Sequence, residues 1–386
     1  THCISSAASD VYKRQVFIQM SLDSIAMSLK EGENYTEITS RSKGISLPSR
    51  ITTLNTLKAI HPSKIFKNGV KDTPLTSISY DDKGRYILTS GTDETLQLYE
   101  VPKGRHVKSI FSKKYGCDLA MFAHNSHTKC IFASTKENNI LRLLNLNDNS
   151  FIRYFKGHDA QVVSLINSTS TPRSESFYSS SLDGTVKCWD LRAKGFTASL
   201  GLHSTPLIAL DPSNTVMAIF EIEDSQINLV SMEKFPSGLI ASKNLKNILD
   251  KYQLTPTNIQ FTNDNRYILV TTTELKHIVL DAYTLDLIVY LSGGMPFTER
   301  QYPDIGCLTA TPNSEYALSG SGNGDILVWN LKNLQSGVSN SILVPSAIIS
   351  NKSSLSNGIL PRMIRYNPEY EMLAVADTEL SFWTSN

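Results

Sequence analysis

The chain has 386 residues, of which 40% are hydrophobic and 19% are charged, and it contains 16 tyrosines and 14 phenylalanines. This composition is typical of a large globular protein rich in β-structure, and the length suits one large domain or two smaller ones. No run of about 18 apolar residues occurs, so we expect no membrane-spanning helix. The formal net charge of +1 argues against nucleic acid as the main ligand, because binding a phosphate backbone needs concentrated positive charge.

The cysteines are isolated along the chain, at Cys3, Cys117, Cys130, Cys188 and Cys307. None forms a Cys-x-x-Cys pair, and none has a His nearby at metal-binding spacing. We therefore expect buried free thiols in a reducing compartment, with no metal site and no cofactor.

The N-terminal region differs from the rest of the chain. Ser5 to Gln15 read SSAASDVYKRQ, the in-frame translation of a transposase-based sequencing-library adapter, so we interpret residues 1–19 as a non-native leader and Met20 as the native start. The alternative is a genuine disordered leader. Residues 20–63 are rich in Ser, Thr and charge with weak periodicity, and we expect them to be mostly disordered.

Residues 64–386 carry a repeated pattern of short apolar strands. Aligning the units on their third strand gives seven equivalent positions whose spacing runs from 41 to 54 residues: Tyr99, Leu144, Trp189, Val230, Leu280, Trp329 and Trp383. Each position follows a second apolar run and a turn. A period of about 40–45 residues with four strands per unit is typical of a blade repeat, so seven units predict seven blades.

The third unit, Phe155 to Arg192, is the most complete. It begins with Gly157-His158, ends with Trp189-Asp190, and has the Asx-Gly turn Asp183-Gly184 between its second and third strands. Such turns between alternating apolar runs indicate hairpins. The unit resembles a WD repeat, one four-stranded blade of a β-propeller. We therefore predict an all-β fold, a seven-bladed WD-repeat β-propeller.

The resemblance to WD repeats implies a hydrogen-bonded structural tetrad at His158, Ser179, Asp183 and Trp189. In such a chain every buried polar atom has a partner. The alternative is a nucleophilic triad of Ser179, His158 and Asp183. The sequence around Ser179 has no nucleophile elbow and no oxyanion-hole turn, so we predict no catalytic residue here and no enzymatic activity.

Ring closure can be predicted from the two ends of the repeat region. The seventh unit ends in its third strand, ELSFWTS, and therefore lacks one strand. Lys64 to Lys67, KIFK, precede the first unit without a hairpin partner of their own. We expect them to supply the missing outer strand, which leaves neither terminal blade with an open edge.

Several loops stand out from the repeat. Gly320 to Gly324, GSGNG, superficially resemble a phosphate-binding loop, but they lie between two strands and open no helix, so we predict a tight turn. Three connections are long: Thr169 to Ser176, Gly293 to Asp304, and Gln335 to Gly358. The second of these contains Met295, Phe297, Arg300 and Tyr302. Such a mixture of aromatic and basic residues is common at interfaces. A loop that folds its own aromatics onto the rim explains the mixture equally well.

The stretches SKKYGCDLAMFAH (Ser112 to His124), FIRYFKGH (Phe151 to His158) and SSSLDGTVKCWDLR, with LDPSNTV, TNDNRYILVTTT, DAYTLD and a terminal FW, resemble the Swd2 family of WD-repeat proteins. The likeness covers Lys64 to Thr384. It implies a non-catalytic nuclear subunit of the COMPASS complex, which methylates lysine 4 of histone H3. In budding yeasts it also implies membership of the cleavage and polyadenylation factor. The expected partners are protein subunits around a monomeric propeller, with no membrane and no sequence-specific nucleic acid.

Two other functions remain open from the residues alone. A propeller enzyme would use its central channel, but the predicted first strands bring no cluster of acids or histidines to it. A different WD-repeat scaffold, such as a ubiquitin-ligase adaptor or a ribosome-assembly factor, fits the fold equally well, because fold alone does not fix the partner.

We predict a partner-binding site at Lys113, Lys114 and Tyr115, in the connection between the first and second blades. Two adjacent ammonium groups beside an aromatic ring suit an acidic or phosphorylated segment. The alternative is that Tyr115 packs inward and both lysines are merely solvated.

Overall fold

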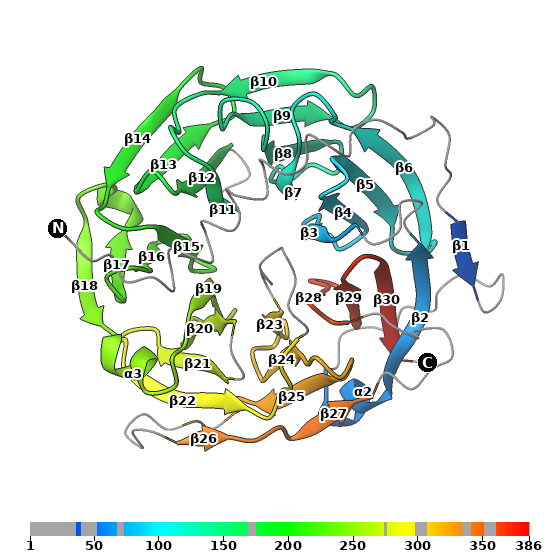
Figure 1. Ribbon diagram of the computed structural model, residues 1–386, viewed down its shortest axis with the longest axis vertical. Helices are drawn as coiled ribbons and strands as arrows, with labels where there is room; N and C mark the ends of the chain where they lie inside the picture. The colour runs from blue at the N-terminus through cyan, green and yellow to red at the C-terminus, as the bar shows by residue number, and fades with distance from the viewer. Residues whose placement is uncertain are drawn as a thin grey trace.

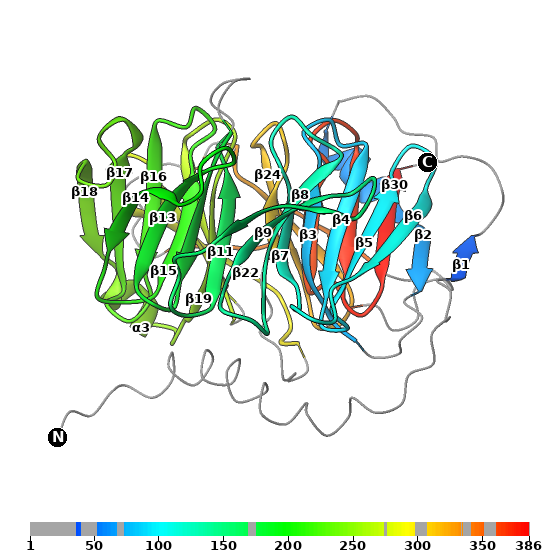
Figure 2. The same ribbon diagram turned by 90° about the horizontal axis from the view of Figure 1, so that it is seen from above.

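The computed structural model describes residues 36–39, 52–67, 73–168, 175–273, 276–297, 307–332, 334, 341–350 and 360–385. In this part of the chain the strands form seven sheets, which stand around a central axis as the blades of a ring (Figure 1). Seen from the side, the strand ends gather at two opposite faces (Figure 2). The predicted seven-bladed all-β propeller is therefore confirmed.

Blades one to four each have four strands, numbered here from the axis outward. They are β3 (Leu75–Tyr80), β4 (Tyr86–Gly91), β5 (Thr95–Glu100) and β6 (Arg105–Phe111); β7 (Asp118–Phe122), β8 (Lys129–Ala133), β9 (Leu141–Asn145) and β10 (Phe151–Phe155); β11 (Val162–Asn167), β12 (Ser176–Ser181), β13 (Thr185–Asp190) and β14 (Phe196–Gly201); and β15 (Pro206–Leu210), β16 (Val216–Glu221), β17 (Gln226–Ser231) and β18 (Leu239–Asn244).

Blades five and seven each have a fifth strand at the outer edge, whereas blade six has four strands. Their strands are β19 (Pro256–Phe261), β20 (Tyr267–Thr272), β21 (Lys276–Asp281), β22 (Leu287–Ser292) and β26 (Ile342–Leu343); β23 (Leu308–Ala310), β24 (Tyr316–Gly320), β25 (Ile326–Asn330) and β27 (Ala347–Ile349); and β28 (Met363–Tyr366), β29 (Met372–Ala376), β30 (Leu380–Ser385), β2 (Ile60–Lys67) and β1 (Thr36–Thr39). The short β26 pairs in parallel with β22, so the connection between β25 and β27 adds an edge strand to the neighbouring blade.

The ring is closed as predicted, because β2 pairs antiparallel with β30 and completes blade seven. The strand begins at Ile60, before the expected Lys64, and it follows helix α2 (Leu54–Ala59). Thr53 caps this helix in a capping box with Thr56. Leu57 of α2 is fully buried in the core between blades six and seven, so this short helix packs against the ring.

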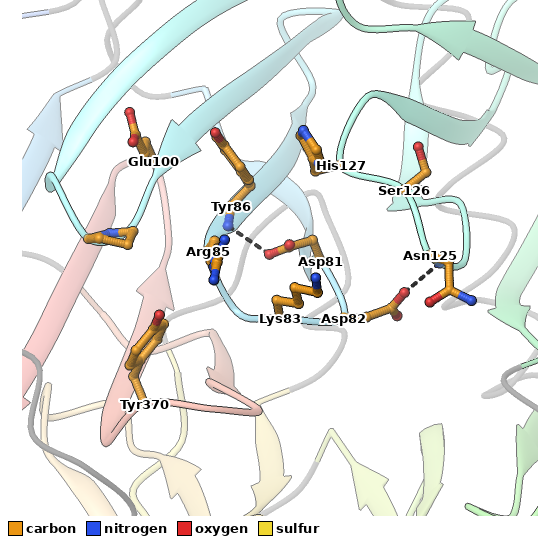
Figure 3. Close-up of a pocket in the computed structure, with 11 residues that line it drawn as sticks. Asp81, Asp82, Lys83, Arg85, Tyr86, Glu100, Asn125, Ser126, His127 and Tyr370 are labelled. Atoms are coloured by element: carbon orange, nitrogen blue, oxygen red, sulfur yellow. Dashed lines mark hydrogen bonds between the residues drawn. The ribbon is translucent and has the colours of Figure 1, made fainter. Parts of the chain in front are cut away.

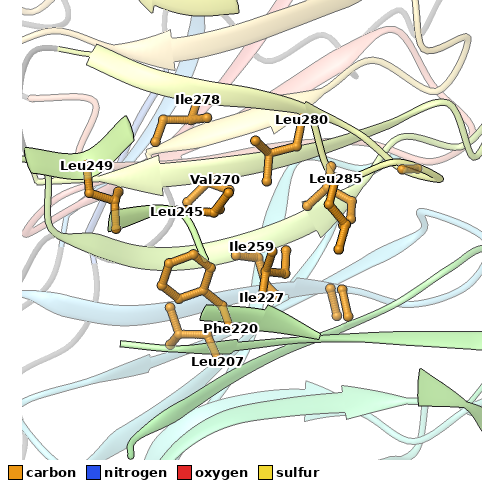
Figure 4. Packing of buried hydrophobic residues seen from close by; sticks show 14 of the residues in the cluster. Leu207, Phe220, Ile227, Leu245, Leu249, Ile259, Val270, Ile278, Leu280 and Leu285 are labelled. Atoms are coloured by element: carbon orange, nitrogen blue, oxygen red, sulfur yellow. The ribbon is translucent and has the colours of Figure 1, made fainter. Parts of the chain in front are cut away.

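The core lies between neighbouring blades, where the alternating apolar residues of one sheet face those of the next. Between blades four and five the cluster includes Phe220, Ile259 and Leu280 (Figure 4). Leu249, from the short helix α3 (Lys246–Asp250), joins the same cluster. Val230 and Leu280, which stand at the Trp position of these two blades, are 3% and 0% exposed. Apolar burial therefore stabilises the blades that lack a Trp.

The structure describes only some of the loops that stand out in the sequence. Gly320 to Gly324 form a tight turn between β24 and β25, closed by a 2.9 Å hydrogen bond from the Ser321 N–H to the Asp325 carbonyl. Several predicted segments lie outside the described residues: the N-terminal leader, most of residues 20–63, and large parts of the three long connections. Arg300 and Tyr302 are among these residues. A one-turn 3-10 helix, Met232–Lys234, follows β17. None of the helices described here could cross a membrane.

Candidate partner-binding surface

The connection between β6 and β7 is a tight turn that places Lys113 and Lys114 at its tip. The N–H groups of Tyr115 and Gly116 both donate to the Ser112 carbonyl, at 3.0 and 2.7 Å. Gly116 has φ +68°, and a Cβ atom there would lie 1.8 Å from the Thr135 hydroxyl. Only glycine fits such a position, so the Ser-Lys-Lys-Tyr-Gly sequence encodes a turn that exposes two adjacent cations.

Aromatic rings lie beneath both lysines. The Lys113 ammonium is 5.7 Å from the Phe111 ring centroid, and the Lys114 ammonium is 5.1 Å from that of Tyr115. These are cation–π distances. Neither ammonium has a carboxylate partner among the described residues, whereas the nearby Lys136 forms an ion pair with Glu94. The turn therefore presents positive charge that no acid of the described structure neutralises.

Tyr115 itself is half-buried. The Arg142 guanidinium carbon lies 3.5 Å from its ring centroid, and the Phe151 ring meets it edge-on at 5.6 Å. Arg142 is almost fully buried, and its Nε donates to the Ser134 hydroxyl at 2.7 Å. These contacts hold Tyr115 against blade two. Phe111, with 65% of its surface exposed, is the more accessible ring beside the lysines, and sequence reasoning missed it because outer strands commonly carry single exposed apolar residues.

The four predicted tetrad residues are brought together in blade three. His158 Nδ1 lies 3.0 Å from an Asp183 carboxylate oxygen, and His158 Nε2 lies 2.7 Å from the Ser179 hydroxyl. Trp189 Nε1 donates to the same hydroxyl at 2.8 Å. Because the carboxylate only accepts, Nδ1 donates to Asp183 and Nε2 accepts from the Ser179 O–H. The hydrogen-bonded chain is the one that the WD pattern predicts.

The environment of this tetrad favours a structural role over nucleophilic chemistry. Ser179 and Trp189 are 0% exposed and His158 is 5% exposed, so no substrate reaches the hydroxyl. Burial alone would raise the pKa of Asp183, but hydrogen bonds from His158, Thr185 and the Asp159 N–H outweigh it and hold that pKa well below its usual range. Asp183 therefore stays ionised and fixes the imidazole.

A second histidine network, which sequence reasoning missed, joins blades five and six. His277 of β21 is buried, and its Nε2 lies 2.8 Å from the Ser319 hydroxyl of β24. Its Nδ1 accepts from the Thr272 N–H at 3.2 Å, so the ring is neutral with the proton on Nε2. Trp329 donates to the Ser292 carbonyl, and Asn323 bonds Asp325. Ser319 and Trp329 stand at the Ser and Trp positions of the sixth repeat unit, but His277 is visible in the sequence only as a lone His in the apolar strand KHIVLD.

Stability should depend on the protonation of His277. Burial lowers the pKa of His277 to about 4 from an ordinary 6.5, so the folded state binds a proton less readily than the unfolded state. The contribution of the neutral His277 to the free energy of unfolding is fully present above pH 6.5 and is lost as the pH falls towards 4. About 2 kcal/mol of it is lost at pH 5. Urea unfolding at pH 7.5 and pH 5 should show that His277→Gln loses less free energy of unfolding on acidification than the native protein does.

The matched control is His203→Gln, which changes an exposed histidine. It should retain the full acid loss. An acid loss in His277→Gln as large as that of the native protein would mean that His277 does not control this pH dependence.

Fold and repeat pattern together define a WD-repeat β-propeller. The family model described as WD domain, G-beta repeat matches residues 149–190 and 298–330. The chain is 34% identical over 330 residues to the COMPASS component SWD2 of Saccharomyces cerevisiae, covering 85% of this chain and 96% of that protein. It belongs to the Swd2 family of WD-repeat proteins.

Two further relatives have similar coverage. The Set1 complex component swd2 of Schizosaccharomyces pombe is 31% identical over 361 residues, covering 86% of this chain and 98% of that protein. The WD repeat-containing protein 82 of Drosophila melanogaster is 29% identical over 335 residues, covering 85% and 95%. The predicted resemblance is therefore confirmed along almost the whole propeller.

Proposed function

We propose that this protein is a non-catalytic scaffold subunit of a nuclear Set1/COMPASS-type complex that methylates lysine 4 of histone H3. The observation that carries the proposal is the 34% and 31% identity, over at least 96% of their length, to two yeast proteins named as components of these complexes. A likeness over 85% and 86% of this chain is far longer than one WD repeat, so it goes beyond the WD motif.

The geometry supports a scaffold. In the described residues the Ser, His and Asp that could resemble a triad are buried in a satisfied hydrogen-bond network, and the rim carries exposed, unneutralised cations at Lys113 and Lys114. Such a surface recognises another protein through complementary charge. The family resemblance further leads us to propose a second assembly, the cleavage and polyadenylation factor.

Purification of the tagged protein from its own cells, followed by mass spectrometry, tests both assignments. We expect a Set1-type methyltransferase and its associated subunits, and depletion of the protein should lower methylation of histone H3 lysine 4 on immunoblots. Subunits of the cleavage and polyadenylation factor should be recovered as a separate set. Recovery of only ubiquitin-ligase or ribosome-assembly proteins would contradict the proposal.

We assign Phe111, Lys113 and Lys114 to the binding of an acidic partner segment. The double substitution Lys113→Glu with Lys114→Glu reverses two charges at the tip of the turn, so it should abolish or strongly reduce co-purification of one partner subunit. Both side chains are exposed, and such changes alter the free energy of unfolding by within about 0.5 kcal/mol. Quantitative mass spectrometry of the purified complex measures the loss.

The matched control reverses two other exposed lysines, Lys194→Glu with Lys234→Glu, in the β13–β14 and β17–β18 connections. It should retain every partner. If the Lys113 and Lys114 variant melts like the native protein and retains every partner even at raised salt, the assignment of this surface is wrong.

A further inference from the structure

A pocket of about 530 Å³ lies where blades seven, one and two meet (Figure 3). Its walls come from the β3–β4, β5–β6, β7–β8 and β28–β29 turns. Strand β7 begins just after the Lys113–Lys114 turn and ends just before Asn125, which lines the pocket. The pocket therefore opens on the opposite face of the ring from the candidate partner-binding surface. Its volume is in the range of ligand-binding pockets, about 300–1,000 Å³.

The acidic residues of the pocket wall are already engaged within the protein. Asp81 accepts from the Tyr86 N–H at 2.7 Å, and Asp82 accepts from the Asn125 N–H at 2.5 Å (Figure 3). Glu100 forms ion pairs with Lys103 and Arg105, at 2.8 and 2.7 Å. A hydrogen bond from Lys103, helped by Arg105, lowers the pKa of Glu100. All three carboxylates therefore already have partners other than Lys83 and Arg85.

The two cations of the pocket are in the opposite situation. Lys83 and Arg85 lie in the β3–β4 turn and are exposed. In the described part of the chain, neither the Lys83 ammonium nor the Arg85 guanidinium has a hydrogen-bond or ion-pair partner. Together with the Lys103 and Arg105 that pair with Glu100, Lys83 and Arg85 give four cations against the three carboxylates of the wall, Asp81, Asp82 and Glu100. This excess of one positive charge favours a ligand with a single negative charge.

Aromatic rings line the pocket beside these cations. Tyr86 and His127 are stacked, with ring centroids 5.3 Å apart and an interplanar angle of 11°. Tyr370, from blade seven, lines the pocket beyond Arg85 (Figure 3). The stacked pair joins blade one to blade two and forms a flat aromatic wall of the pocket. A flat aromatic wall next to free cations suits a ligand that carries an acid and an apolar group side by side.

We propose that this pocket binds an extended peptide segment of a partner protein through a Glu or Asp side chain. The carboxylate lies between Lys83 and Arg85, where the guanidinium can form two parallel hydrogen bonds to it. The neighbouring apolar side chain of the peptide packs against Tyr86 and His127. This second site is independent of the Lys113 surface and of the identity of the complex.

The charges of the wall select a carboxylate over the other anions. Asp82 and Glu100 line the same pocket, so a phosphate dianion meets more repulsion there than a single carboxylate does. Two cations are also too few for a nucleic-acid backbone, which is bound by neutralising many phosphates. A singly charged side chain on a protein segment is the ligand that fits both the cations and the acids.

Fluorescence anisotropy with a labelled GSELELSG peptide tests the proposal in low salt. We expect saturable binding to the full chain, at least tenfold weaker binding of the Gln-substituted peptide GSQLQLSG, and weaker binding as salt is raised. The double substitution Lys83→Ala with Arg85→Ala should weaken binding at least tenfold. Lys194→Ala with Lys234→Ala removes the same charge elsewhere and should leave binding unchanged.

Each other result would overturn the proposal. Absence of saturable binding, or binding unaffected in the Lys83 and Arg85 variant, rules out this pocket as the site. Tighter binding of a phosphoserine version of the peptide rules out the carboxylate, and tighter binding of a labelled single-stranded RNA rules out a protein segment. Melting curves of the two double variants verify that both are folded. Membership of the complex is measured separately, by purification. Failure of the peptide-binding test therefore leaves the proposed function standing, and failure of the purification test leaves the peptide site standing.

Discussion

Trp189→Ala is expected to lower the free energy of unfolding by about 3–5 kcal/mol, because it removes a large side chain from a closed site and leaves a cavity. Trp189 is 0% exposed. Its ring stacks on Phe177 at 6.1 Å and meets Phe155 and Phe196 edge-on at 5.8 and 5.9 Å. The substitution also removes the indole donor to Ser179. Urea unfolding of the full chain measures the loss.

Two comparisons show whether the tetrad accounts for this effect. Asp183→Ala removes the carboxylate acceptor of the His158 imidazole in a buried site and leaves only the Thr185 hydroxyl, 3.2 Å from Nδ1, so it should cost about 1–3 kcal/mol. Val230→Ala changes the equivalent position of blade four, where no such network exists, and should cost less than Trp189→Ala because less volume is removed. Native-like melting of both Trp189→Ala and Asp183→Ala would show that the network does not stabilise the blade.

Blade architecture could be predicted because its determinants are local in sequence. The alternation of apolar residues, the turn at Asp183-Gly184 and the recurring third-strand positions each lie within one unit, and all seven aligned positions fall in third strands of the structure. Successive side chains of a strand point to opposite faces of its sheet, with a period of two. A repeat that preserves this period therefore remains detectable where Val230 and Leu280 have replaced the Trp.

The features that escaped prediction depend on contacts between units. His277 forms a hydrogen bond with Ser319, which is 42 residues later and in the next blade, and no motif marks His277 as the partner of that Ser. Leu57 belongs to a short helix in a Ser/Thr-rich stretch whose sequence has little periodicity, and it becomes helical through its Thr53 cap and its burial between two blades. Tertiary packing decides such elements more than local propensity does.

The two candidate sites differ in how far each can be predicted from the sequence. Lys113 and Lys114 are adjacent in sequence, so their shared charge is visible before folding. The pocket needs Arg85 of blade one, His127 of blade two and Tyr370 of blade seven together, and only closure of the ring brings blade seven beside blade one. Ring closure is thus a condition for this site as well as for stability.

Phe66→Ala tests that closure directly. Phe66 lies on β2, the N-terminal strand that completes blade seven, and it is 2% exposed, with ring centroids 4.8 Å from Tyr99 of blade one and 4.9 Å from Phe382 of blade seven. Truncating it removes two of the aromatic contacts at the junction of the first and last blades and leaves a cavity there, so we expect a loss of about 3–5 kcal/mol in urea unfolding. Phe111→Ala, on the outer strand of blade one and 65% exposed, removes the same atoms from the surface and should change stability by within about 0.5 kcal/mol. A buried contact that joins the two ends of the ring must cost more free energy to lose than an exposed one. Equal urea midpoints for the two variants would therefore mean that the N-terminal strand does not hold the ring together.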